Sequence, residues 1–149
     1  MMKMRMTRYT DYAIRSLLFA GANADRLVRI QEVADCYDIS KNHLMKVVYR
    51  LGQNGLIHSV RGRGGGFRLA SPPDEIYIGD VVQLFEPTTH FLDPLEGTSE
   101  LPSLDPARDA FDDAIAAFHQ VLNSYTINDL LHPTNSTHRQ ILEMIPSRD

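Results

Sequence analysis

The sequence predicts a mainly α-helical protein with one small β-hairpin. Apolar residues recur at intervals of three and four through most of the first 86 residues, and again after residue 105. Between them, two short segments rich in β-branched and aromatic residues flank a glycine-rich tip, which is typical of a two-stranded hairpin. Together these observations predict a winged helix-turn-helix followed by a long C-terminal helix.

The first predicted helix covers residues 10–22, and a shorter second helix covers residues 30–37. The second segment is followed by Asp38-Ile39-Ser40, a turn former and a helix N-cap residue that separate it from the next helix. The apolar residues of each segment fall on one helical face: Ala13, Ile14, Leu17, Leu18 and Ala22 in the first, Ile30, Val33, Ala34 and Tyr37 in the second.

The third helix completes a helix-turn-helix over residues 29–51. It ends near Gly52 and Gly55, because glycine readily adopts the left-handed backbone that stops a helix. Its predicted buried stripe consists of Leu44, Val47, Val48 and Leu51.

A wing is predicted from residues 56–60 and 67–70, which flank the segment Arg61-Gly-Arg-Gly-Gly-Gly66. Glycines 64–66 remove side chains where the loop turns and where backbone N–H groups can approach a phosphate. Arg61, Arg63 and Arg68 supply positive charge to this hairpin.

After the wing, the sequence predicts a helix at residues 79–86, an acidic loop at 87–104 and a long helix from residue 105. Thr126 and Asp129 have the spacing of a capping box and begin a further turn. We therefore divide the chain into a winged-helix domain (1–86), the loop (87–104), a dimerisation helix with its following turn (105–132) and a C-terminal tail (133–149). The apolar face of the long helix is broad enough to be covered by a second copy.

The two halves of the chain carry opposite charge. Residues 1–70 hold 12 Lys and Arg against 5 Asp and Glu, whereas residues 71–149 hold 3 against 14, within a net charge of −4. A weakly acidic protein can therefore present a basic face. The charge pattern favours double-stranded DNA as the partner of the first half.

The predicted DNA-binding site comprises the third helix and the wing. Its members are Ser40, Lys41, Asn42, His43, Lys46, Arg50, Arg61, Arg63 and Arg68. Asn42 and His43 are expected to meet base edges in the major groove, because the N-terminal end of such a helix lies closest to them. Lys41, Lys46 and Arg50 are expected to hold the DNA backbone. Arg61 and Arg63 are expected to enter the minor groove, whose negative potential favours arginine.

Other interpretations of these segments have less support. Cations on a helix are usually a solvated face, but a basic wing beside them favours DNA. The glycine-rich segment could hold a nucleotide phosphate, yet it lacks the Gly-Lys-Ser/Thr ending of a Walker loop and does not precede a helix. No Ser/His/Asp spacing supports an enzyme. We expect a cytoplasmic protein without a membrane span, because apolar runs are short and the N-terminus lacks an export signal.

Five segments of the sequence, between about residues 6 and 132, resemble the NsrR group of the Rrf-two family of winged-helix regulators, which also contains IscR. They are Thr10-Asp-Tyr-Ala-Ile-Arg-Ser-Leu, Ile39-Ser-Lys-Asn-His-Leu-Met-Lys-Val-Val, Val60-Arg-Gly-Arg-Gly-Gly-Gly-Phe-Arg-Leu, Ile78-Gly-Asp-Val-Val and Tyr125-Thr-Ile-Asn-Asp-Leu. The resemblance implies a homodimer that binds a near-palindromic operator and represses transcription. The competing hypothesis is a protein-interaction or small-molecule-sensing winged-helix module without its own operator.

The cofactor of iron–sulfur members of this family is not expected here. Those members carry three cysteines between the fourth helix and the dimer helix, whereas residues 87–108 contain none and Cys36 is the only cysteine of the chain. The loop instead offers hard oxygen donors, at Asp93, Glu96, Glu100 and Asp105, which with His90 could bind a divalent ion. Asp11 matches the position of a carboxylate ligand in some relatives, but an acidic residue in a first helical turn also suits the helix dipole.

Overall fold

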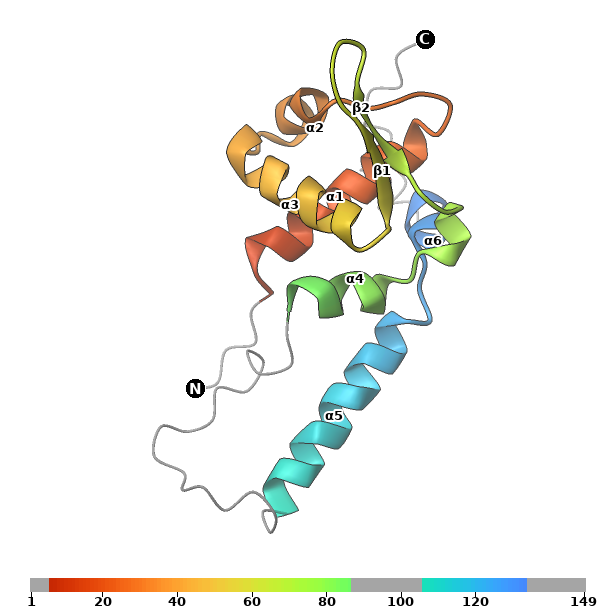
Figure 1. Cartoon of the computed structure of the whole chain (residues 1–149). Helices are drawn as coiled ribbons and strands as arrows, with labels where there is room; N and C mark the ends of the chain where they lie inside the picture. The colour runs from red at the N-terminus through yellow and green to blue at the C-terminus, as the bar shows by residue number, and fades with distance from the viewer. Residues whose placement is uncertain (1–5, 87–105, 134–149) are drawn as a thin grey trace.

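The structure is a computed structural model that describes residues 6–86 and 106–133 (Figure 1). The expected loop at 87–104 and residues 134–149 of the expected tail lie outside the described part. The elements in chain order are α1 (Arg8–Ala22), α2 (Ile30–Tyr37), α3 (Lys41–Gln53), β1 (Ile57–Val60), β2 (Gly66–Leu69), the 3-10 turn η1 (Pro73–Glu75), α4 (Ile78–Phe85), α5 (Pro106–Leu122) and α6 (Ile127–Leu131). The predicted fold class is confirmed.

Helix α1 lies at the centre of the fold. It packs against α2, α3, α4, α6 and β2, so these elements share one core. Ala13, Leu17 and Phe19 of α1 are buried in this core together with the predicted stripe of α3. Burial of these apolar side chains supplies the main driving force for the arrangement.

The turn between α2 and α3 requires an unusual backbone. Asp38 has a φ of 53°, in the left-handed region that aspartate tolerates better than most residues. The Ile39 N–H then donates to the Ala34 carbonyl at 3.0 Å, which closes the end of α2. Ser40 occupies the expected N-cap position of α3, but its side chain makes no capping hydrogen bond to that helix.

The wing is attached to the core at its base. Strands β1 and β2 are antiparallel, with Ile57 opposite Leu69 and Ser59 opposite Phe67. On the other side of β2, Val28 pairs with Phe67 through two backbone hydrogen bonds of 2.9 and 2.8 Å. A side chain at Gly66 would approach the Val28 carbonyl oxygen to 2.4 Å, so this close pairing requires glycine.

Helix α5 begins away from the body of the protein and runs back toward it, so that its C-terminal end lies beside α4 (Figure 1). The helical spacing of apolar residues continues in the sequence to Tyr125, but α5 ends at Leu122 and residues 123–125 form a turn. The predicted Thr126–Asp129 capping box is confirmed: the Asp129 N–H donates to Thr126 Oγ1 at 3.2 Å, and the Thr126 N–H donates to Asp129 Oδ2 at 2.8 Å. Ile127, the first residue of α6, is fully buried, so α6 packs with the winged-helix core.

Glu86 ties the end of α4 to the start of α1. Its carboxylate is only 2% exposed and accepts hydrogen bonds from the Thr7 backbone N–H and, at 2.7 Å, from the Thr10 hydroxyl. A carboxylate at a helix N-terminus satisfies free N–H groups and complements the helix dipole. Glu86 therefore stabilises the first turn of α1 from a distant position in the sequence.

Replacing Glu86 with alanine is expected to lower the free energy of unfolding by about 1–3 kcal/mol, because the buried Thr10 hydroxyl loses its acceptor. Urea denaturation followed by circular dichroism measures this change. Glu75→Ala is the matched control, since Glu75 is exposed on η1 and its removal should change stability by no more than about 0.5 kcal/mol. Equal effects of the two substitutions would contradict the assigned role of Glu86.

Candidate nucleic-acid interface

Helix α3 presents a polar face because its apolar stripe is buried. Leu44, Val47, Val48 and Leu51 pack into the core, which leaves the opposite side of the helix in solvent. Three of the predicted DNA-binding residues, Lys41, Asn42 and Lys46, are exposed on that side. Ser40, at the N-cap, is exposed as well.

His43 is placed differently from the other predicted residues of this helix. It is half-buried, with its ring stacked on Tyr12 at 6.3 Å between centroids and edge-on to Tyr9 at 6.0 Å. These two tyrosines belong to α1, so His43 joins the N-terminal ends of α1 and α3. Its ring is therefore partly occupied in packing and only partly available to a base.

Arg50 also has an intramolecular partner. Its guanidinium carbon lies 5.2 Å from the centre of the Phe85 ring, a distance at which a cation is attracted to an aromatic face. Phe85 is the last residue of α4. Arg50 is thus exposed but held at the C-terminal end of α3, on the side that faces α4.

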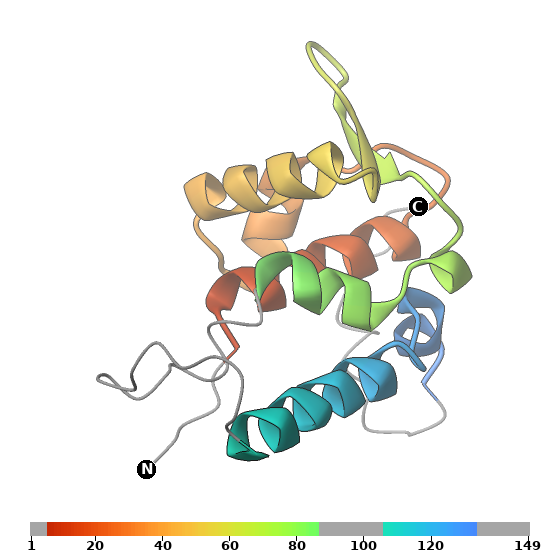
Figure 2. The same ribbon diagram turned by 60° about the horizontal axis from the view of Figure 1, so that its bottom comes forward.

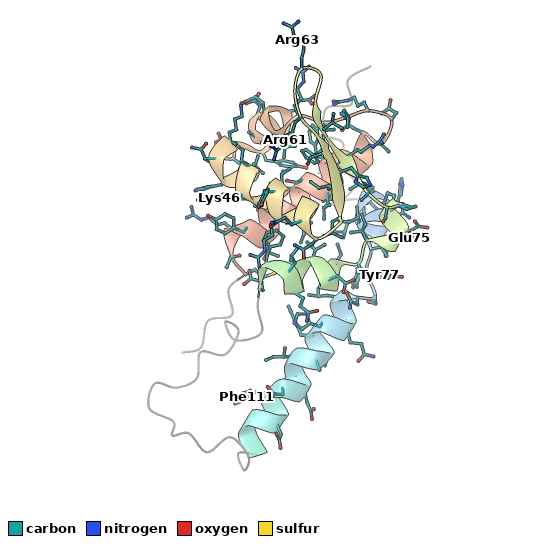
Figure 3. The ribbon with its side chains drawn as sticks, viewed as in Figure 1. Lys46, Arg61, Arg63, Glu75, Tyr77 and Phe111 are labelled. Atoms are coloured by element: carbon teal, nitrogen blue, oxygen red, sulfur yellow. The ribbon has the colours of Figure 1, made fainter. Side chains whose placement is uncertain are left out.

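The arginines of the wing are exposed on a loop built from glycines. Gly62 and Gly64 have φ values of 97° and 75°, and the Gly65 N–H donates to the Gly62 carbonyl at 3.0 Å. Arg63 extends from the end of the hairpin in Figure 3. Arg61 is exposed just after β1, and Arg68 is exposed on β2 opposite His58.

The wing and α3 lie on the same side of the molecule. In Figure 2 the hairpin rises beyond α3, whereas α5 lies beyond α4 on the opposite side. The fold therefore brings together the exposed cations of α3 and of the wing. It separates them from the acidic helix that begins at Pro106.

Sequence reasoning missed two exposed residues on α3. Met45 is 51% exposed and Tyr49 is 62% exposed, beside the predicted contact residues. The sequence does contain a signal for them. Both are apolar residues outside the predicted buried stripe, and because they are four positions apart they share one helical face. We define Met45 and Tyr49 as the apolar strip of α3.

Cysteine ligands for a metal or cluster are scarce. Cys36 lies half-buried on α2, and burial raises the pKa of its thiol, which disfavours the thiolate that binds metals. Asp11 is engaged locally, since its carboxylate accepts a hydrogen bond from Arg15 Nε at 2.9 Å. Within residues 6–86 and 106–133, no three His, Cys, Asp or Glu side chains gather as a metal site.

The fold and this basic face define a winged-helix DNA-binding protein. The profile of the Rrf2 family, described as an iron-dependent transcriptional regulator, matches residues 6–133. The chain belongs to this family, and it is a DNA-binding transcriptional regulator. None of the helices in the described ranges is both long and apolar enough to cross a bilayer.

Curated relatives are similar over most of their length. The chain is 41% identical over 132 residues to the HTH-type transcriptional regulator NsrR of Bacillus subtilis, covering 86% of this chain and 90% of that protein. It is 40% identical over 143 residues to NsrR of Halalkalibacterium halodurans, covering 93% and 97% of the two chains.

Solved structures share the fold. CymR, the global cysteine regulator of B. subtilis, matches with a TM-score of 0.70 and 25% identity, over 89% of this chain and all of that one. IscR of T. potens matches with a TM-score of 0.72 and 22% identity, over 91% of this chain and 92% of that one.

Proposed function

We propose that the protein acts as a homodimer on a near-palindromic operator and represses transcription from the DNA that it occupies. The main support for this proposal is that α3 and the wing share one face of the molecule. The cations exposed on these two elements are Lys41, Lys46, Arg61 and Arg63. Two such faces related by a two-fold axis require two half-sites of inverted sequence. This function places the protein in the cytoplasm, where bacterial DNA lies.

Within each half-site, α3 enters the major groove and the wing follows the neighbouring backbone into the minor groove. Asn42, exposed near the N-terminus of α3, can pair bidentately with an adenine. Lys41 and Lys46 bind phosphates, and Arg61 and Arg63 occupy the minor groove. His43 and Arg50 act mainly by positioning α3, because the imidazole of His43 already packs on Tyr12 and the guanidinium of Arg50 on Phe85. Ser40, at the N-cap of α3, and Arg68, on β2, complete the proposed DNA-binding residues at the edges of the interface.

Neutralisation of DNA charge by Lys46 on α3 and by Arg63 in the minor groove predicts a specific salt dependence. Changing both residues to alanine should lower operator affinity and reduce the slope of log K against log salt concentration by about 4, because the dimer loses two cations at each of its two half-sites and releases about four fewer counterions. Fluorescence anisotropy with a labelled operator at several salt concentrations measures this slope.

Charge-retaining variants provide the control for that experiment. Lys46→Arg together with Arg63→Lys should keep the wild-type slope. A wild-type protein that binds no duplex selectively would favour instead the competing function, a winged-helix module without its own operator.

The proposed dimer interface is the apolar face of α5. Near its C-terminal end, Phe118 and Leu122 pack against the core. The same face continues away from the core through Ile115 and Phe111, and Phe111 is 46% exposed (Figure 3). A second copy of α5 is the partner that best fits an apolar stripe continuous with a buried one.

Phe111→Asp is therefore expected to raise the dimer dissociation constant about tenfold or more, because a charge would enter the apolar interface. Sedimentation velocity over a range of protein concentrations measures the change. Asp113→Ala is the matched control, since Asp113 is exposed on another side of α5 and should leave the dimer intact. A wild-type chain that sediments as a monomer would contradict this interface.

We further propose that this regulator works without an iron–sulfur cluster. A dimer would contain only two cysteines, both at position 36 of α2, whereas such clusters are usually held by several thiolates. Protein purified without oxygen is expected to contain iron and sulfide far below one cluster per protomer and to bind its operator in that state. Stoichiometric iron and sulfide in anaerobic protein would overturn this proposal.

A further inference from the structure

The apolar strip of α3 is the surface feature that the proposed contacts do not use. Met45 and Tyr49 are 51% and 62% exposed on a helix whose other outward residues are mostly polar or charged. Exposed apolar side chains are common one at a time, but two on adjacent turns of a presented face form a small contact surface. Lys46 follows Met45 directly, so a ligand bound there also meets positive charge.

Tyr49 is held in a defined orientation. Gln53 Nε2 donates a hydrogen bond of 2.9 Å to the Tyr49 hydroxyl, which fixes the phenol ring along the helix surface. Burial of Val48 and Leu51 fixes the rotation of the helix itself. The Tyr49 ring is therefore pre-ordered, and little side-chain freedom is lost when it binds.

We propose that this strip reads thymine methyl groups in the major groove of each operator half-site. The inference rests on the proposed function and names the base chemistry that the site recognises. Thymine is the natural base with an apolar group on the major-groove edge, and apolar side chains recognise that methyl. Asn42 lies one turn before Met45 on α3, and asparagine pairs with adenine, so adjacent residues of the helix read A·T pairs.

The direct probe is a duplex that lacks individual methyl groups. A duplex recovered from a randomised library with the full chain is remade with deoxyuridine in place of each thymine in turn, which removes the methyl and keeps the base pairing. Replacing a contacted thymine should weaken binding about fourfold, the loss expected for one methyl group no longer removed from water.

Protein variants assign the effect to the strip. In Met45→Ala or Tyr49→Ala, the duplex with thymine should bind more weakly, and the deoxyuridine penalty should disappear at the thymine that the lost side chain contacts. Tyr49→Phe keeps the ring and should keep the penalty. Tyr77→Ala is the matched control, because Tyr77 is a 43% exposed aromatic residue beside α4, away from α3 in Figure 3.

The outcomes separate this inference from the function on which it rests. A selected duplex whose affinity is unchanged by deoxyuridine at every thymine overturns the inference and leaves the regulator function standing. Penalties that persist undiminished in both alanine variants overturn the inference in the same way. Failure to recover any duplex overturns both. Thermal melting confirms that each variant is folded, and since both side chains are exposed, the melting temperatures should stay close to that of the wild type.

Discussion

Burial of one side of α3 is the constraint on which the rest of the structure depends. Leu44, Val47, Val48 and Leu51 are each at most 5% exposed, so the helix can rotate only by exchanging apolar residues for polar ones in the core. The position of the outward face follows directly from this constraint. Pairing of Val28 with Phe67 then fixes the wing beside that face, and the two basic surfaces become one.

The position of α3 depends in turn on α1. Tyr9 and Tyr12 hold His43 at the N-terminal end of α3, while Glu86 holds the first turn of α1 through Thr7 and Thr10. These contacts run without a break from the end of α4 to the end of α3 that meets DNA in the proposed complex. Glu86, at the end of α4, is thus connected to the candidate interface.

Local patterns predicted the elements well, because their signals lie within a few residues of each other. The bounds of α2, the buried stripe of α3 and the Thr126–Asp129 capping box all followed from spacing and residue type. The stacking of His43, the cation–π contact of Arg50 and the burial of Glu86 could not be predicted in this way. Each depends on an aromatic ring or helix end supplied by a distant segment, and a single sequence does not reveal which segments meet.

The opposite charges of the two halves gain a structural meaning from this arrangement. The basic residues of the first half include those exposed on α3 and the wing, whereas Asp109, Asp112 and Asp113 are exposed on α5, which lies on the other side of α4. A polyanion is attracted to one side and repelled from the other. In the proposed dimer, this polarity would orient both copies with α3 toward the duplex before any base is read. Electrostatic attraction brings this face to any DNA sequence, and the base contacts of α3 then distinguish the operator from other sequences.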